Sequence, residues 1–402
     1  MNCDYIWRKR MQLNSNNLYK LSLFLYIVFL PISISIRQAG IILLTLVFVY
    51  DCFKNKAYYV LFKWTENKFL LIFLCYLLFN SLFVSMDSRT SLDVLFNAIW
   101  QCFLVYYILS SITISKKVDK NYILLLLMIS VTIQGIDGIY QFVTGYDFIK
   151  HLKPFGDRLT ASLDTPRVGN FVSLSLPAFF AYYFRNNDTF ESWKAKLLLF
   201  VAFLPPLFLL IFSKTRSGWV GFFVFLSIFS FYNVRKLFLP VFSILVLILF
   251  FFKKIILNRL NFNIILNDPR FELWTIALKL FKLKPIFGHG VATFCNAFNY
   301  YHLYPTKTSR HIQHPHNIYV QFLSETGIIG LLLFFTFIFG RLFNLLKTFL
   351  KTKSILLWIY VAWICSYLAT AFSAHNFFRT WWLGTFMIVF AITSPEDETS
   401  SF

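Results

Sequence analysis

The chain has 402 residues, of which 58% are apolar and 21% aromatic, while only 14% are charged. Soluble globular proteins carry about 25% charged and about 45–50% apolar residues, so this composition argues against a soluble protein. The formal net charge is +20, but Lys and Arg are scattered between apolar runs, which does not fit a nucleic-acid-binding face. Six cysteines form no CxxC pair, which argues against a disulfide framework or a zinc site.

Apolar runs separated by polar loops predict an all-α, polytopic membrane protein with about twelve transmembrane helices. No small-residue cleavage site follows the first run, so we interpret it as a retained helix and not as a signal peptide. The expected spans lie near residues 19–36, 39–53, 68–85, 94–114, 121–144, 170–184, 196–213, 217–232, 236–252, 317–340, 354–372 and 377–393.

The distribution of Lys and Arg predicts the orientation. Alternate loops, beginning with the N-terminus, hold 20 of these residues, whereas the short loops on the other side hold five. Because cytoplasmic loops are enriched in Lys and Arg, both termini should be cytoplasmic. The expected organisation is an N-terminal bundle over 1–252 with about nine spans and an external loop at 145–169, a large basic external loop at 253–316, and three spans with a short tail over 317–402.

The loop 253–316 has nine basic residues against two acidic ones, Asp268 and Glu272. Residues 270–284 are predicted to form a helix that either lies against the membrane or caps the bundle. Its apolar face would be made of Phe271, Trp274, Leu278 and Phe281. A basic cover of this kind suits an anionic substrate that stays near the membrane surface.

Polar side chains inside predicted spans are costly in a bilayer and are therefore candidates for function. Asp137 lies between Gln134 and Gln141 on one helical face, and Glu325 follows Gln321 by one turn. The alternative interpretation is that these groups form hydrogen bonds between helices and hold the bundle together.

Three external arginines, Arg167, Arg216 and Arg379, precede predicted spans, and Arg270 opens the basic helix. Such arginines are often interfacial anchors. Arg216, however, lies in the short loop KTRS before Gly218 and Trp219, where its position is tightly held. A guanidinium fixed there could bind a diphosphate through two parallel hydrogen bonds.

Three histidines, His311, His314 and His316, fall within six residues directly before the tenth span. Three interpretations stay open. His314 and His316 could bind a metal, although no neighbouring carboxylate or cysteine supports this. His316 could cap the following helix. A neutral imidazole could also act as a general base that takes a proton from a hydroxyl.

In their order and spacing, several segments resemble the O-antigen ligase family and its relatives, the O-antigen polymerases. His316-Asn317 is followed by nine residues and Gly327, as in the ligases, and Thr215–Trp219 gives a good second match. The first 130 residues match only in spacing and hydropathy. The other similar segments are GIYQFVTGYD, RLTASLDTPRVGNFVSLSLP, PRFELW and PIFGHG.

The resemblance implies a membrane-embedded glycosyltransferase of the C type, with about twelve transmembrane helices and a partly helical periplasmic cap. Such an enzyme of the bacterial inner membrane transfers glycan from undecaprenyl diphosphate to a sugar hydroxyl of lipid A–core, with inversion and without a metal or other cofactor. Carried over to this sequence, His316 would be the base, and Arg216, Arg270 and, less specifically, Arg167 would hold the diphosphate. Supporting roles are expected for Asn317, His314, Arg158, Asp137 and Arg379.

Three alternatives remain. An O-antigen polymerase would use the same donor and a lipid-linked glycan as acceptor. A protein O-oligosaccharyltransferase shares the core motif but usually has a longer C-terminal external region. A transporter or flippase would fit twelve spans, but its functional residues are expected near the bilayer midplane, with repeated broken helices that this sequence lacks.

Overall fold

The computed structural model describes residues 15–55, 65–163, 165–186, 192–232, 268–309, 311–373 and 376–393. Over these ranges the regular structure is helical, apart from an isolated bridge between Phe155 and Arg158. The predicted span 236–252 lies outside the described residues. The longer elements of the N-terminal part are α2 (Ser15–Val28), α3 (Ile34–Asn55), α4 (Thr65–Phe79), α5 (Ser88–Val94), α6 (Gln101–Ile114), α7 (Lys120–Thr144), α8 (Val168–Ser175), α9 (Pro177–Arg185), α10 (Trp193–Phe212) and α11 (Arg216–Tyr232). Further along the chain are α15 (Arg270–Leu283), α16 (Phe294–Tyr300), α17 (Ile318–Thr352), α18 (Ile355–Ala371) and α19 (Thr380–Ile392).

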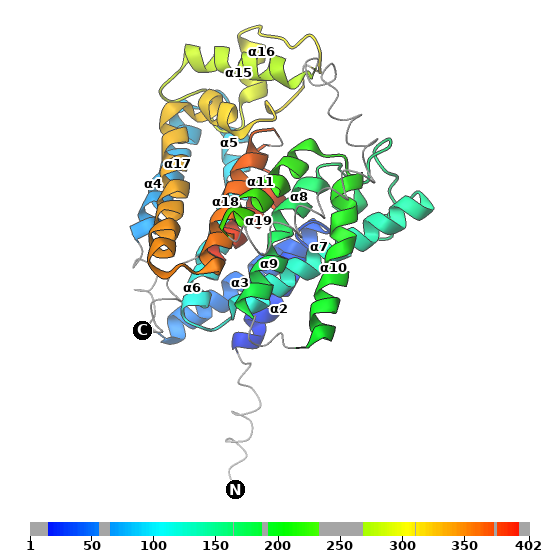
Figure 1. Ribbon diagram of the computed structural model, residues 1–402. Coiled ribbons are helices and arrows are strands. Elements are labelled where there is room, and N and C mark those ends of the chain that lie inside the picture. Colours follow the sequence, from blue (N-terminus) through cyan, green and yellow to red (C-terminus); the bar gives the residue numbers. More distant parts are fainter. Residues whose placement is uncertain are drawn as a thin grey trace, which may run out of the picture.

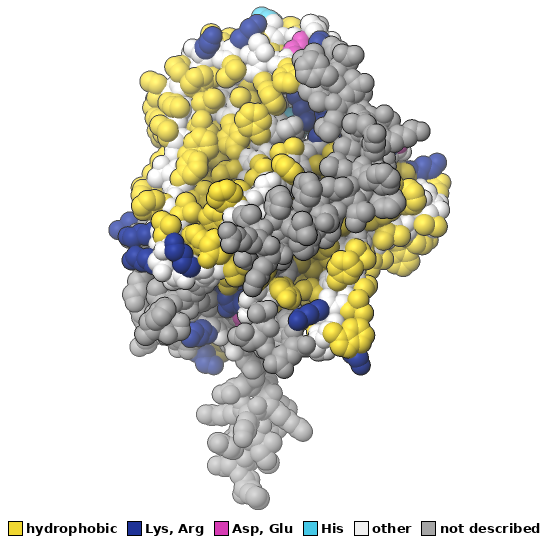
Figure 2. Space-filling model, viewed as in Figure 1, with side chains coloured by type: hydrophobic (Ala, Val, Ile, Leu, Met, Phe, Trp, Pro, Cys, Tyr) yellow, Lys and Arg dark blue, Asp and Glu magenta, His cyan; other side chains and the backbone are white. Residues whose placement is uncertain are grey.

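The described helices form a bundle suited to a bilayer. Five of them are long and apolar enough to cross a membrane, and four shorter apolar helices accompany them. Figure 2 shows a broad hydrophobic belt, with Lys and Arg side chains gathered toward its two ends. Apolar side chains such as Phe83 and Phe231 are more than three-quarters exposed, as expected where lipid and not water surrounds the protein. The chain is therefore a helical, multi-pass membrane protein.

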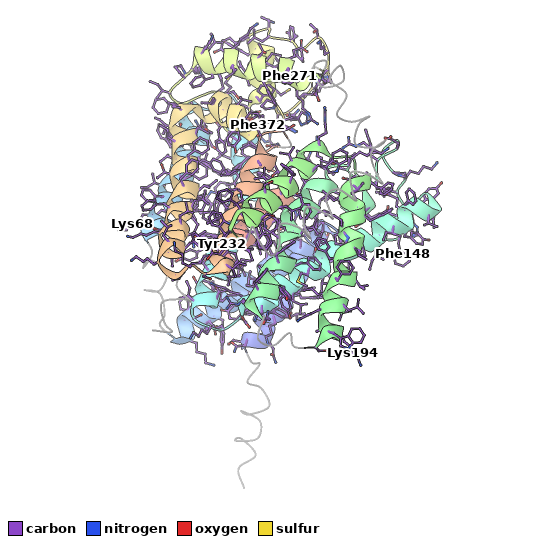
Figure 3. The ribbon with its side chains drawn as sticks, in the orientation of Figure 1. Lys68, Phe148, Lys194, Tyr232, Phe271 and Phe372 are labelled. Atoms are coloured by element: carbon purple, nitrogen blue, oxygen red, sulfur yellow. The ribbon has the colours of Figure 1, made fainter. Side chains whose placement is uncertain are left out.

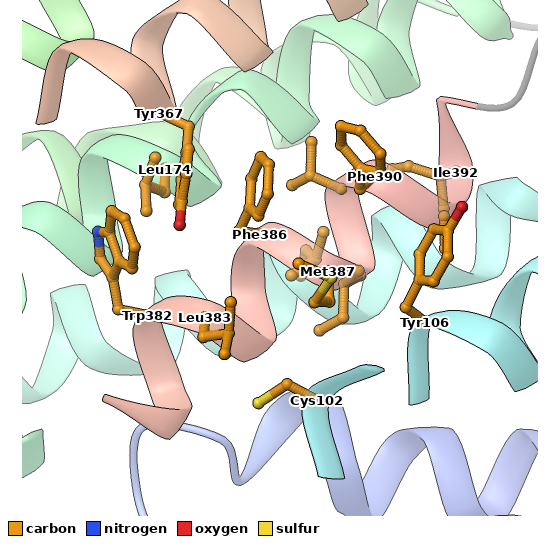
Figure 4. Close-up of a cluster of buried hydrophobic side chains, with 14 of the residues drawn as sticks. Cys102, Tyr106, Leu174, Tyr367, Trp382, Leu383, Phe386, Met387, Phe390 and Ile392 are labelled. Atoms are coloured by element: carbon orange, nitrogen blue, oxygen red, sulfur yellow. The ribbon is translucent and has the colours of Figure 1, made fainter. Parts of the chain in front are cut away.

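The centre of the bundle is packed with aromatic rings. The ring of Tyr367 on α18 stacks on Phe386 of α19, with 3.6 Å between centroids, and on Trp382 at 4.1 Å (Figure 4). The buried Trp363 indole donates to the carbonyl of Leu174 at 2.6 Å and so joins α18 to α8. These contacts fix α8 and α19 relative to α18.

Several predicted spans differ from the structure. The first, predicted over 19–36, ends at Val28, and the next helix begins at Ile34. The span predicted for 170–184 starts earlier and is divided into α8 and α9, because Pro177 has no N–H for a helical hydrogen bond. The span predicted to end near 340 continues in α17 to Thr352. Arg341, expected in a loop, is instead fully buried, donates to the Tyr106 hydroxyl at 3.1 Å and lies 5.1 Å from the ring centre of Phe390.

Helices α15 and α16 lie together at one end of the bundle (Figure 1). The helix predicted over 270–284 is present, but its apolar face was only partly recognised. Leu273, Ile276, Ala277 and Leu280 are the buried residues, and they form a cluster with Phe294 and Phe298 of α16. Phe271 and Leu278, on the expected face, are each 43% exposed. The helix thus has two apolar sides: one packs against α16, and on the other Phe271 and Leu278 remain largely exposed.

Helix α17 has a kink at Gly327, and the chain that follows α15 packs against this kink. Gly327 has φ 66° and ψ −170°, a conformation almost restricted to glycine. The backbone of residues 286–290 passes alongside, so that Gly290 N–H donates to the Glu325 carbonyl at 2.8 Å and His289 N–H to Ser324 at 3.1 Å. The Glu325 carboxylate also accepts from Ala292 N–H at 3.0 Å. These bonds support the structural interpretation of the buried Glu325.

We expect Gly327→Ala to destabilise the protein by at least about 2 kcal/mol, because the conformation is strained for alanine and the new methyl group crowds backbone. An ideal Cβ there would lie 2.1 Å from the Ile286 carbonyl oxygen. Gly340→Ala is the matched control in the same helix, since a Cβ at Gly340 meets nothing within 4 Å. Thermal unfolding of the detergent-purified proteins checks this, and equal melting temperatures for the two variants would contradict it.

Candidate active site

The short segment before α17 presents two histidines next to each other. Asn317 is the N-cap of this helix, and its side-chain oxygen accepts from Tyr319 N–H at 2.9 Å and from Val320 N–H at 3.3 Å. The interpretation in which His316 caps the helix is therefore wrong. His316 instead has a left-handed backbone with φ 59°. The centroid of its ring lies 4.4 Å from the centroid of the His314 ring, and the interplanar angle is 67°.

The histidine segment is fastened to α15. The indole N–H of Trp274 donates to the carbonyl of Pro315, between the two histidines, at 3.0 Å. The same indole packs edge-to-face on Phe271 and on Phe372 at the end of α18, with centroids 5.2 and 5.8 Å away. Figure 3 shows Phe271 and Phe372 at the same end of the bundle. Trp274, predicted only as part of an apolar face, thus positions the histidines.

Arg216 and Arg270 are brought together by one carboxylate. Arg216 opens α11 and forms an ion pair with Asp268 at 2.5 Å. The other oxygen of Asp268 accepts from the backbone N–H of Arg270 at 3.1 Å and lies 3.7 Å from its Nε. Arg270 also donates from Nη1 to the carbonyl and hydroxyl of Ser373, each at 3.0 Å. In the sequence, Asp268 stands out only as one of two acidic residues in a basic loop, and no motif indicates that it bridges two arginines.

Arg167 and Arg379 complete a group of cations around His316. Each is the N-cap of a helix, Arg167 of α8 and Arg379 of α19. Burial is the main cause that lowers the pKa of Arg167 to about 10, and the charges of Arg379 and Arg270 act in the same direction. Arg167 still carries its charge at neutral pH. Three of the predicted arginines therefore act on one another, and Arg270 links them to Arg216 through Asp268.

His316 is uncharged in this environment. Burial is the main cause that lowers its pKa to about 3, and the charges of Arg167, Arg270 and Arg379 act in the same direction, against an opposing effect of Asp268. Burial also holds the pKa of His314 well below its usual range, followed by the effects of His316, Arg167 and Arg379. At neutral pH a ring nitrogen of His316 is therefore free of its proton and can act as a base.

Arg158 contacts the residues directly before Arg216. Its Nε donates to the Ser213 carbonyl at 3.0 Å, and its Nη2 donates to the Thr215 hydroxyl at 3.2 Å, directly before Arg216. The Thr215 hydroxyl in turn donates to the carbonyl of Pro166, the residue before Arg167. Arg158 thus braces the two turns that carry Arg167 and Arg216.

Close packing of α8 on α11 also fixes these turns. An ideal Cβ on Gly218 would lie 2.6 Å from the Gly169 carbonyl oxygen, so only glycine permits this approach. At the adjacent residues, the Ser217 hydroxyl donates to the Asn170 side-chain oxygen at 2.9 Å. The two helix N-termini that carry Arg167 and Arg216 are therefore held side by side.

Asp137 belongs to a different set of contacts. Its carboxylate accepts from Phe148 N–H at 2.6 Å, and Gln141 accepts from Thr160 N–H and Ala161 N–H at 2.9 and 3.0 Å. These side chains on α7 hold the segment that leads back to α8. The structure does not give Asp137 a contact with the arginines or histidines described above, which favours the hydrogen-bonding interpretation.

In the part of the chain that the structure describes, His314 and His316 have no third side chain with which to hold a metal ion. Among the described residues, no group of three or more His, Cys, Asp or Glu side chains is placed to hold a metal ion. The chemistry that the site offers is instead a neutral base next to a cluster of guanidinium groups. Because anions are favoured at helix N-termini, the starts of α8, α11, α15 and α19 add to the same preference for an anionic ligand.

We expect Asp268→Asn to lower the stability of the ligand-free protein by about 1–2 kcal/mol, because two partly buried guanidiniums lose their shared counter-charge. Asp157→Asn is the matched control. Asp157 also pairs at 2.5 Å, with Lys214, but its side chain is 71% exposed, so its loss should cost less than about 1 kcal/mol. Thermal unfolding of both variants checks this, and an equal effect would refute the bridging role of Asp268.

Comparison with known proteins identifies part of the chain. Residues 198–335 match the model of the Wzy_C family, described as O-antigen ligase. The match begins within α10, includes α11, α15 and α16, and ends within α17, whereas Arg158, Arg167 and Arg379 lie outside it. No curated protein matches the chain. The resemblance inferred from the motifs is confirmed: residues 198–335, which carry Arg216, Arg270 and His316, match the O-antigen ligase family.

Proposed function

We propose that the protein is an O-antigen ligase that transfers a polysaccharide from undecaprenyl diphosphate to a sugar hydroxyl of lipid A–core. The observation that carries the proposal is the neutral His316 beside Arg167, Arg270 and Arg379, with Arg216 joined through Asp268. Family membership supports the ligase/polymerase class. The choice of lipid A–core as acceptor rests on the spacing of nine residues between Asn317 and Gly327.

In the proposed reaction, a ring nitrogen of His316 takes the proton of the acceptor hydroxyl. The acceptor oxygen attacks the anomeric carbon of the donor from the side opposite the diphosphate, and the bond from that carbon to the diphosphate oxygen breaks. Undecaprenyl diphosphate leaves with the electron pair, and the configuration is inverted. Arg216 and Arg270, helped by Arg167, stabilise the charge that develops on the leaving group. This route uses no metal ion.

The proposed orientation places the site at the periplasmic face of the inner membrane, with both chain termini in the cytoplasm. Lys194, at the start of α10, lies at the end of the bundle opposite Phe271 (Figure 3). Lys347, Lys351 and Lys353 near the end of α17 are also far along that helix from His316. Basic residues away from the site and an anion-binding site on the other side agree with the positive-inside rule.

Deleting the gene should remove the O-antigen ladder from lipopolysaccharide gels while long polymer accumulates on undecaprenyl diphosphate. A core that carries a single repeat would instead identify a polymerase, and an unchanged profile would contradict both.

Returning His316→Ala to the deletion strain should leave transfer at least about 100-fold lower, the scale of general-base catalysis. His311→Ala, in the same segment but exposed, should restore the ladder.

Wild-type transfer should continue in EDTA, and a loss reversed by added zinc or magnesium would refute the metal-free route.

The pKa of His316 predicts a difference between two pH profiles. In the free enzyme the base form is present above pH of about 3 and is lost as the pH falls through that value. The profile of kcat/KM, which reports the free enzyme, should therefore show no acid limb from His316 between about pH 5 and 8. Once the donor diphosphate neutralises the arginines, the pKa of His316 should rise. The acid limb of kcat should then lie at higher pH than that of kcat/KM, and coincident limbs would contradict this.

A further inference from the structure

His314 is a buried polar side chain for which the described residues supply no hydrogen-bond partner. Its side chain is 6% exposed, and neither Nδ1 nor Nε2 forms a hydrogen bond with the described residues. Most buried polar side-chain atoms in proteins have a partner, and burial without one is destabilising. An imidazole with two such atoms therefore weakens the ligand-free fold and calls for a functional explanation.

The position of His314 ties it to the active site. Its ring is in edge contact with His316, and Pro315 between them is held by the Trp274 indole. Arg167 and Arg379 are close enough for their charges to act on it. The same residues surround His316. A ligand that reaches the proposed base therefore comes within reach of His314.

The chemistry of a neutral imidazole selects the ligand atom. It has one N–H donor and one nitrogen that accepts. An ionised diphosphate offers only acceptors, so it can satisfy the N–H but not the accepting nitrogen. A hydroxyl group both donates and accepts, and a sugar ring carries several. Of the diphosphate and the sugar hydroxyls that the proposed reaction brings to this site, only the hydroxyls can satisfy both ring nitrogens.

We infer that His314 binds hydroxyl groups of the saccharide beside His316 and so positions the sugar at which transfer takes place. This inference rests on the proposed function and adds to it a residue that contacts the sugar and not the diphosphate. The hydroxyls can belong to the donor glycan or to the acceptor core. Both sources present the same chemistry, and the experiment separates them.

The test replaces the imidazole with side chains that keep its volume but not its polar atoms. His314→Phe and His314→Leu are compared with His314→Gln, which keeps a donor and an acceptor, and with His311→Phe, the same change at an exposed histidine. Transfer is measured with lipid-linked glycan and lipid A–core extracted from a strain that lacks the gene. Melting temperatures are recorded alone, with bare undecaprenyl diphosphate and with the glycan-bearing donor.

We expect both apolar variants to melt at or above the wild-type temperature, because two unpaired buried atoms are removed. Their KM for one substrate should rise about 3- to 10-fold for each hydrogen bond lost. A rise for the lipid-linked glycan, with a smaller stabilisation by that donor, would place the contact on the donor, and a rise for lipid A–core would place it on the acceptor. Stabilisation by bare undecaprenyl diphosphate should stay unchanged, and His314→Gln should recover most of the affinity.

Two outcomes would overturn the inference. Wild-type KM values for both substrates in a folded apolar variant would show that the imidazole only fills space. Failure of both apolar variants to fold, while His314→Gln folds, would show that the polar atoms serve the fold. The proposed function fails separately, if the wild-type protein itself transfers no glycan to lipid A–core.

Discussion

Like charges repel one another, so several guanidinium groups gather at the half-buried end of a helical bundle only where the structure holds them there. Asp268 meets this constraint between Arg216 and Arg270, with one oxygen for each. Arg270 is further tied to Ser373 beyond α18, and Arg216 is fixed by the packing of Gly218 against Gly169. The result is a cluster with excess positive charge, in which an anionic ligand would relieve repulsion that the protein only partly compensates.

The same excess of positive charge explains the state of the histidines. A cation does not form easily in a buried place beside other cations, so the pKa of His316 falls to about 3 and the ring stays neutral. Its basicity is consequently coupled to the ligand. In the proposed reaction, an empty site holds a weak base, and the arrival of a diphosphate that neutralises the arginines makes that base stronger. His314, which is buried and forms no hydrogen bond with the described residues, would depend on the ligand in the same sense.

The backbone that presents these groups is built from helix N-termini. Asn317 caps α17 and leaves His316 outside the helix in a left-handed conformation, while the kink at Gly327 admits the chain that follows α15. Trp274 then connects α15 to the histidine segment. Replacing any one of these elements would move the base relative to the arginines, because the site has no single rigid element that carries all of its groups.

The membrane character, most helix positions, the family segment and the candidate residues His316, Arg216 and Arg270 could be predicted from the order of amino acids. These features follow from hydropathy, from helix-ending residues and from local motifs, all of which are properties of neighbouring residues in the chain. Other features became visible only in the folded chain. Asp268 joins two arginines, Arg341 is buried against Tyr106, α15 packs through Leu273 and Leu280, and Asp137 and Arg158 brace loops. Burial, charge compensation and pKa depend on which distant segments of the chain come into contact. Hydropathy along the chain does not predict those contacts.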